Sequence, residues 1–192
     1  MTIRKLLVAN RGEIACRVIK MEQAPTPMIM WSVKDLHLPY GMAITASHNP
    51  ALYNGIKVFT AGGRDADETV TDDIERRMAA LEGEPEAGIG HVPYQRAVEE
   101  GKVTEIKPFN GYIDSIISQV DMKAIREADL KVALDPMFGV SRTSLQTILL
   151  TARAELDVIH DRRDTLFGGR VPSPTSATLE ALKRWVVENE CD

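Results

Sequence analysis

Ser47, His48 and Lys57 are residues whose types could carry out nucleophilic chemistry. Ser47 lies in a hydroxyl-rich turn, residues 45–50, which directly follows the apolar run 42–44. This pattern predicts a strand that ends in an exposed loop, with a second strand after it. A serine hydroxyl can carry a phosphoryl group reversibly when it is exposed on a strained turn near cations and amide donors. His48 and Lys57 could supply the positive charge or the protons.

Three further residues would shape this loop. Asn49 and Asn54 can fix a turn by hydrogen bonding to their own backbone, and Gly55 permits close approach of another group. An ordinary surface turn has the same composition. The residues alone therefore leave both a chemical and a purely structural interpretation open.

The rest of the chain alternates short apolar runs with amphipathic segments. Residues 82–107 form a polar segment with glycines and prolines and no clear hydrophobic period, which predicts a linker. The strand after the serine loop follows too closely for a helical crossover, so the first sheet should be mixed. Elsewhere the alternation predicts parallel α/β layers in both halves. The predicted strands are 6–9, 130–134 and 156–159. The predicted helices include 13–20, 28–36, 70–81, 112–120, a segment carrying Leu145, Ile148 and Leu149, and 178–188. For the helix at 28–36, Thr26 is predicted as the N-cap and Pro27 as the first helical position.

Composition excludes several classes of function. The chain has 192 residues, is 44% hydrophobic and has a net charge of -5, with Lys and Arg scattered along it. A nucleic-acid footprint or an anionic membrane surface as partner is therefore not expected, and no apolar run has the length of a membrane span. Cys16 and Cys191 match no metal or redox spacing, which predicts unpaired thiols and a cytoplasmic location.

The beginning of the chain resembles the N-terminus of biotin carboxylases. Residues 5–15, Lys-Leu-Leu-Val-Ala-Asn-Arg-Gly-Glu-Ile-Ala, carry this resemblance, which covers about the first 20 residues. It implies a strand and a helix but no carboxylase activity. Gly12 alone is too weak a signal for a phosphate-binding loop.

Residues 24–192 resemble the α-D-phosphohexomutases, the family of phosphoglucomutases and phosphomannomutases. The signature is Thr-Ala-Ser-His-Asn-Pro at 45–50, continued by Tyr-Asn-Gly-Ile-Lys at 53–57. Pro-Thr-Pro at 25–27, Asp-Pro-Met-Phe-Gly-Val at 135–140, Asp-Thr-Leu-Phe at 164–167 and Pro-Ser-Pro at 172–174 support it. The resemblance implies an α/β fold of two incomplete three-layer α/β/α domains, at 23–103 and 104–192, with 1–22 as a carboxylase-like segment packed with the first. The chain is thus interpreted as a chimera.

The resemblance also implies an activity and a site. In the family, the serine at Ser47 is phosphorylated at rest and exchanges its phosphoryl group with a hexose phosphate through a sugar bisphosphate. The implied catalytic residues are Ser47, His48 and Lys57, Lys57 in acid–base work, with Asn49 and Asn54 binding substrate.

Magnesium is the cofactor that the resemblance implies. The family holds Mg2+ between the phosphate on Ser47 and three aspartates of an Asp-Gly-Asp-x-Asp-Arg loop, and this chain ends at residues 190–192, just before that loop is expected. We therefore expect no stable Mg2+ binding. Asp135, Asp161 and Asp164 are predicted to be turn and cap residues rather than substitute ligands.

Three hypotheses follow. The chain is a phosphohexomutase by descent that needs further domains for turnover, or a truncated, non-catalytic interaction module, or a carboxylase-related nucleotide-binding fragment. Incomplete sheets leave unpaired edges, so the second hypothesis predicts self-association.

Overall fold

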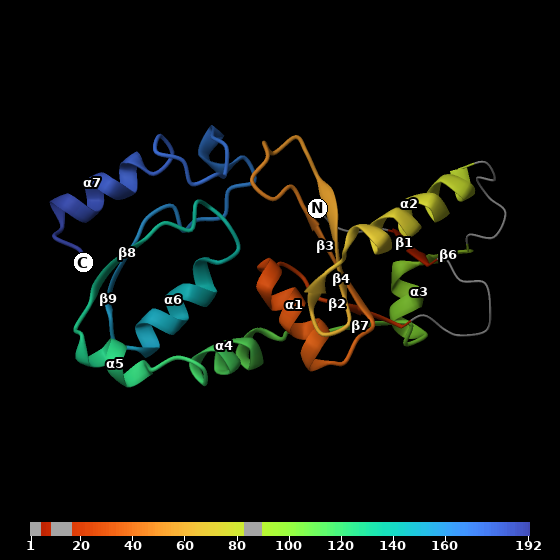
Figure 1. Cartoon of the computed structure of the whole chain (residues 1–192), viewed down its shortest axis with the longest axis horizontal. Helices are drawn as coiled ribbons and strands as arrows, with labels where there is room; N and C mark the ends of the chain where they lie inside the picture. The colour runs from red at the N-terminus through yellow and green to blue at the C-terminus, as the bar shows by residue number, and fades with distance from the viewer. Residues whose placement is uncertain (1–4, 9–16, 83–89) are drawn as a thin grey trace. The chain divides into compact units, whose positions relative to one another are not determined.

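A computed structural model describes residues 5–8, 17–82 and 90–192 (Figure 1). The chain divides into two compact units, each made of two stretches of sequence. Unit 1 comprises Met1–Glu22 and Ala66–Lys107, and unit 2 comprises Gln23–Asp65 and Pro108–Asp192. The serine loop belongs to unit 2.

Unit 1 is built on two strand pairs. Strand β1 (Lys5–Val8) pairs antiparallel with β6 (Gly90–Pro93), and β2 (Val18–Lys20) pairs parallel with β7 (Val103–Glu105). Helix α3 (Tyr94–Glu99) packs against β6 and β7, with Ala97 and Val103 buried. Helix α2 (Glu68–Glu82) also belongs to unit 1. Asp67 caps its first turn, because the Asp67 carboxylate accepts a hydrogen bond from the Val70 N–H.

A cluster of three polar side chains joins the parallel strands of unit 1. Lys20 Nζ donates to Tyr94 Oη at 2.8 Å and to Glu105 Oε1 at 2.9 Å, and the Tyr94 hydroxyl also donates to Glu105. The hydrogen bonds to Tyr94 and then Glu105 raise the pKa of Lys20 to about 12. Those from Tyr94 and Lys20 lower the pKa of the Glu105 carboxyl.

In unit 2, a three-stranded sheet carries the serine loop. Its order is β3 (Tyr40–Thr45), β4 (Gly55–Thr60) and β5 (Arg64–Asp65). The prediction of a mixed sheet is wrong here, because both pairings are antiparallel. Helix α1 (Thr26–Asp35) packs on one face of the β3–β4 hairpin (Figure 1). The core between them is formed by Val33, Ala43 and Phe59, of which Phe59 is completely buried.

Two glycines allow this close packing. A Cβ at Gly41 would lie 2.3 Å from Val33 Cγ2, so only glycine lets helix α1 approach β3 this closely. Gly63 has a φ of 71°, in the left-handed region, and a Cβ there would lie 2.1 Å from the Met30 carbonyl oxygen. Both glycines lie toward the end of the hairpin farther from the serine loop, so α1 is held close to the sheet at that end.

The second part of unit 2 contains a pair of parallel strands. β8 (Lys131–Leu134) pairs with β9 (Glu155–Val158). Helix α6 (Arg142–Thr151) crosses between them, while α4 (Phe109–Ile117) packs on α6 and α7 (Glu180–Glu188) packs on β8. A short helix α5 (Met122–Glu127) and the 3-10 turn η1 (Phe167–Gly169) complete this part. Trp31 of α1 and Tyr112 of α4 pack edge to face with centroids 5.9 Å apart, and burial raises the pKa of the Tyr112 hydroxyl.

The structure confirms most of the predicted elements and corrects three details. Helix α1 begins at Thr26, so Thr26 is not the N-cap: Pro25 occupies that position, and its carbonyl accepts the first helical hydrogen bond, from Met28 N–H. Residues 18–20 form a strand rather than the end of a helix, because they pair with β7, far away in sequence. Residues 13–16 of that predicted helix lie outside the described residues.

The third correction concerns the predicted linker at 82–107. The structure places β6, α3 and β7 there. These elements have three to six residues each, too few to show a period in the sequence.

Candidate active site

The serine loop connects the two long strands of the hairpin. Thr45, the last residue of β3, lies opposite Gly55, the first residue of β4, and Ala43 lies opposite Lys57. Because side chains alternate along a strand, Lys57 is on the same face of the sheet as Thr45 and Ala43, the face on which α1 packs. The hairpin therefore places Lys57 two residues from the base of the loop, a rise of about 7 Å along β4.

The loop is held by hydrogen bonds among its own residues. Ser47 N–H donates to Thr45 Oγ1 at 2.9 Å, and Asn49 N–H donates to the Ala46 carbonyl at 2.9 Å. At the other end, Tyr53 N–H donates to the Pro50 carbonyl at 3.0 Å. The side chains from Ser47 to Lys57 are all exposed, so the loop presents its polar groups to solvent.

Ser47 has an unusual backbone conformation. Its φ is 54°, in the left-handed region that residues with a Cβ rarely adopt. Such a conformation costs on the order of 1–2 kcal/mol and is frequent at functional sites. Ser47 therefore lies on an exposed turn with a strained backbone, as the sequence predicted.

The Ser47 hydroxyl has a histidine as its immediate partner. Ser47 Oγ lies 3.1 Å from His48 Nδ1. When the His48 proton is on Nε2, Nδ1 can accept the hydroxyl proton. When the ring is protonated, Nδ1 donates to an oxygen bound at Ser47. The pair can thus remove a proton from the nucleophile or stabilise negative charge on it.

The three residues predicted to shape the loop behave differently from one another. Asn54 Oδ1 accepts a hydrogen bond from the Gly55 N–H at 3.1 Å, which confirms its backbone contact. Asn49 contributes its backbone N–H to the turn. A Cβ at Gly55 would lie 3.5 Å from the Thr45 carbonyl oxygen, an ordinary contact, so glycine is not needed there for close approach within the chain.

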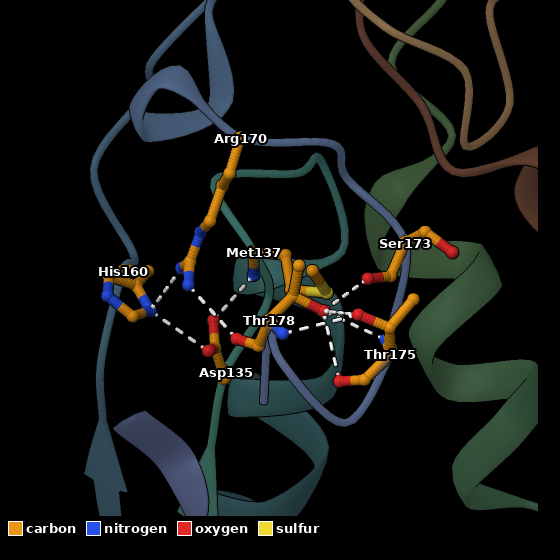
Figure 2. Close-up of polar contacts among 7 residues, drawn as sticks. All are labelled: Asp135, Met137, His160, Arg170, Ser173, Thr175 and Thr178. Atoms are coloured by element: carbon orange, nitrogen blue, oxygen red, sulfur yellow. Dashed lines mark hydrogen bonds and ion pairs between the residues drawn. The ribbon is translucent and has the colours of Figure 1, made fainter. Parts of the chain in front are cut away.

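The aspartates of the second part of unit 2 serve local structure. Asp135, whose side chain is fully buried, accepts from the Met137 N–H at 2.8 Å and contacts His160 Nδ1 at 2.9 Å (Figure 2). Asp164 accepts from the N–H groups of Leu166 and Gly168. This confirms the prediction that both are turn residues, while Asp161 contributes its backbone carbonyl, which accepts from Arg142.

The donor set around Ser47 does not fit a magnesium ion. Mg2+ takes oxygen ligands in near-octahedral geometry, usually with one or two carboxylates, and the loop between Thr45 and Gly55 contains no carboxylate. Among the described residues, no group of three or more His, Cys, Asp or Glu side chains could hold a metal ion.

Sequence reasoning missed two polar contacts. Thr45 Oγ1 accepts a hydrogen bond from the Ser47 N–H, whereas the sequence indicated Thr45 only as part of the signature. A threonine two residues before a turn serine is a signal for this contact. His160 pairs with Asp135, and Arg170 reaches the same His160 nitrogen at 2.9 Å (Figure 2). Asp135 and His160 each directly follow a predicted parallel strand. The carboxyl ends of adjacent parallel strands meet at one edge of a sheet, which is the signal for their contact.

Comparison with known proteins identifies the family. Residues 3–84 match the sequence model described as phosphoglucomutase/phosphomannomutase, alpha/beta/alpha domain I. Residues 110–192 match alpha/beta/alpha domain II of the same family. The chain belongs to the phosphoglucomutase/phosphomannomutase family. This confirms the α/β fold of two α/β/α domains that the sequence implied, while the chimeric origin of residues 1–22 stays an interpretation.

Curated relatives match nearly all of the chain. The phosphoglucosamine/phosphogalactosamine mutase of Sulfurisphaera tokodaii is 31% identical over 92% of the chain and 37% of its own length. The phosphoglucosamine mutase of Thermobifida fusca is 29% identical over 97% of the chain and 38% of its own length. A crystal structure of a phosphoglucomutase/phosphomannomutase family protein from Burkholderia thailandensis superposes with a TM-score of 0.67 at 16% identity, over 92% of the chain and 36% of that protein, and it supports the fold alone.

The chain thus spans well under half the length of these relatives. In the ranges that the structure describes, no helix is both long enough and apolar enough to cross a lipid bilayer.

Proposed function

We propose that residues 45–55 are the phosphoryl-carrying loop of a hexose phosphate mutase, with Ser47 as the residue that accepts and returns the phosphoryl group. The observation that carries the proposal is the exposed Ser47 hydroxyl, 3.1 Å from His48 Nδ1 on a left-handed turn. Family membership supports it. The substrates are hexose phosphates and hexose bisphosphates, including amino sugars, since two of the relatives are named as mutases of phosphoglucosamine.

The proposed transfer balances without a further reactant. Ser47 Oγ attacks the phosphorus of a hexose bisphosphate, and the bond from Oγ to phosphorus forms as the bond from phosphorus to the sugar oxygen breaks. The electron pair stays on that sugar oxygen, which takes a proton to become a hydroxyl. The proton of Ser47 passes to His48 Nδ1. The reverse sequence returns the phosphoryl group to the other hydroxyl of the sugar.

Lys57 and the two asparagines have proposed roles in the same site. The Lys57 ammonium is exposed on the face of β4 that continues from the loop, so it can attract a phosphate or give a proton to the departing sugar oxygen. The amides of Asn49 and Asn54 lie on the exposed loop and can bind sugar hydroxyls. The proposed location of the chain and of its hexose phosphate substrates is the cytoplasm.

Turnover requires more than this chain. Phosphoryl transfer depends mainly on positioning and on stabilising charge, and this chain offers His48 of the loop and Lys57 of β4 for that purpose. We expect slow single transfer to Ser47 by the isolated chain, and mutase activity after the remaining domains of the Thermobifida fusca relative are added.

Mass spectrometry tests this proposal. The chain is incubated with a hexose bisphosphate, alone and with those domains, and tandem spectra locate the phosphoryl group while a coupled assay follows mutase activity. We expect modification at Ser47 that Ser47→Ala abolishes. Ser141→Ala, at another exposed serine, is the matched control and retains it. Unmodified Ser47 together with zero activity in both mixtures overturns the proposal.

A second candidate function is self-association with another copy of the chain. The face of the hairpin opposite α1 carries Tyr40, Met42, Ile44 and Ile56, each more than 60% exposed. Strand β3 contains no charged residue or proline, the features that protect sheet edges from pairing. Light scattering over a range of concentrations tests it, and a monomer at every concentration excludes it.

A further inference from the structure

The conformation of Ser47 depends on one side-chain contact. Its left-handed φ of 54° is unfavourable for a residue with a Cβ. In this conformation the Ser47 N–H points back to Thr45 Oγ1, at 2.9 Å. The other described hydrogen bond of Ser47 is made by its hydroxyl, to His48. The contact with Thr45 therefore opposes relaxation of the turn to an ordinary φ.

Thr45 is well placed to hold this turn. It is the last residue of β3 and pairs with Gly55, so its backbone is fixed by the sheet. Threonine is branched at Cβ, which restricts rotation about χ1. The side chain is half-buried, whereas Ser47 and His48 are exposed. The position of Oγ1 thus follows the position of the sheet, which in turn packs on α1 through Ala43 and Phe59.

We propose that Thr45 Oγ1 is the positioning group of the phosphoryl-carrying loop. By accepting the Ser47 N–H, it holds Ser47 in the left-handed turn and keeps its hydroxyl directed toward His48 and the incoming phosphorus. This inference rests on the proposed function, because it assigns Thr45 a part in that transfer. Thr45 acts through Ser47 and is not itself a reacting group.

Two substitutions at position 45 separate the hydroxyl from the shape of the side chain. Thr45→Val keeps the branched shape and the strand preference but removes the acceptor. Thr45→Ser keeps the acceptor. Thr60→Val is the matched control, since Thr60 lies at the far end of the same hairpin, opposite Tyr40.

The expected effect is on the transfer rate. A typical net hydrogen bond corresponds to about a two- to tenfold change in an equilibrium or rate. We expect Thr45→Val to slow phosphorylation of Ser47 by roughly five- to tenfold at saturating hexose bisphosphate, with an unchanged half-saturating concentration. Thr45→Ser restores most of the rate, and Thr60→Val matches the parent chain.

A structural measurement accompanies the rates. The coupling constant between HN and Hα reports φ, and amide exchange reports protection of the Ser47 N–H. Thr45→Val should change both at Ser47 and leave Phe59 protected, which shows that the hairpin remains folded.

The outcomes distinguish this inference from the function on which it rests. If the parent chain takes up no phosphoryl group at Ser47, the proposed function fails and the role of Thr45 fails with it. If the parent is phosphorylated and Thr45→Val reacts at the same rate, only the role of Thr45 is overturned. Equal slowing in Thr45→Ser and Thr45→Val also overturns it, because the hydroxyl is then not the operative group.

Discussion

The contact between Gly41 and Val33 allows a direct test of how the hairpin is seated on α1. In Gly41→Ala, the new Cβ would lie 2.3 Å from Val33 Cγ2, well inside the roughly 3.5–4.0 Å of a favourable carbon contact. Overpacking of a core typically costs about 1–3 kcal/mol. Val33 is 2% exposed, so Val33→Ala removes two buried carbons at about 0.8 kcal/mol each, plus a cavity contribution, for about 2 kcal/mol in all.

The double variant should be less destabilised than the sum of the two. Val33→Ala removes the atom that the new Cβ meets, and the new methyl group partly fills the space. We expect a coupling free energy of about 1–2 kcal/mol in the stabilising direction. Urea unfolding followed by circular dichroism and by tryptophan fluorescence, to which Trp31 in the same helix contributes, measures the four free energies of unfolding.

Gly55→Ala provides the control for this cycle. Its Cβ would lie 3.5 Å from the nearest atom outside its chain neighbours, an ordinary contact, so it should not couple with Val33→Ala by more than about 0.5 kcal/mol. A Gly41→Ala and Val33→Ala pair that is additive to within that value would refute the packing argument, because the two positions would then not share space.

Two further predictions concern the other polar clusters. Asp135→Ala leaves the Met137 N–H and His160 without their buried acceptor, so it should lower the free energy of unfolding by about 2–4 kcal/mol in urea unfolding. The control Asp161→Ala, at an exposed position, should change the free energy of unfolding by less than about 0.5 kcal/mol. An equal effect of the two substitutions would contradict the assignment. In unit 1, the pKa of Glu105 is lowered in the folded state. Its contribution to stability is therefore present above the ordinary pKa of 4.5 and is lost as the pH falls through the lower folded pKa. The pKa of Lys20 is raised, so its contribution is present below the ordinary pKa of 10.5 and is lost as the pH rises through about 12. Urea midpoints of the parent chain should therefore fall relative to those of Glu105→Gln at both extremes of pH, and parallel curves would show that the cluster does not contribute.

The sequence predicted the elements whose determinants are local. The β3–loop–β4 hairpin was predicted because two short strands flank a turn too short for a crossover. Helix α2 was predicted because Val70, Ile74 and Met78 recur at helical spacing. The serine loop was found from its residue types, and its exposure and strain agree with the predicted chemistry.

Elements that depend on distant partners were not predicted. Val18 and Ile19 fit one face of a helix, yet they form a strand because β7, more than 80 positions later, provides the hydrogen bonds. Strands β6 and β7 were not predicted for the same reason, since they lie in a polar segment and pair with β1 and β2, which are distant in sequence. The contact of Asp135 with His160 joins residues 25 positions apart and arises only when β8 and β9 align in parallel.

The serine loop is held by contacts among its own residues. Each described hydrogen bond that shapes it joins two residues between Thr45 and Gly55, and its base is set by the β3–β4 register. The conformation of Ser47 therefore does not require the domains that the longer relatives possess. What those domains can add is charge stabilisation during transfer, which supplies most of the rate in this chemistry.

Adding the domains of the Thermobifida fusca relative should thus raise the transfer rate while the HN–Hα coupling of Ser47 stays as it is in the isolated chain. A coupling that changes on addition would show that the loop is remodelled by its partners, and the separation between positioning by this chain and charge stabilisation by the remaining domains would be wrong.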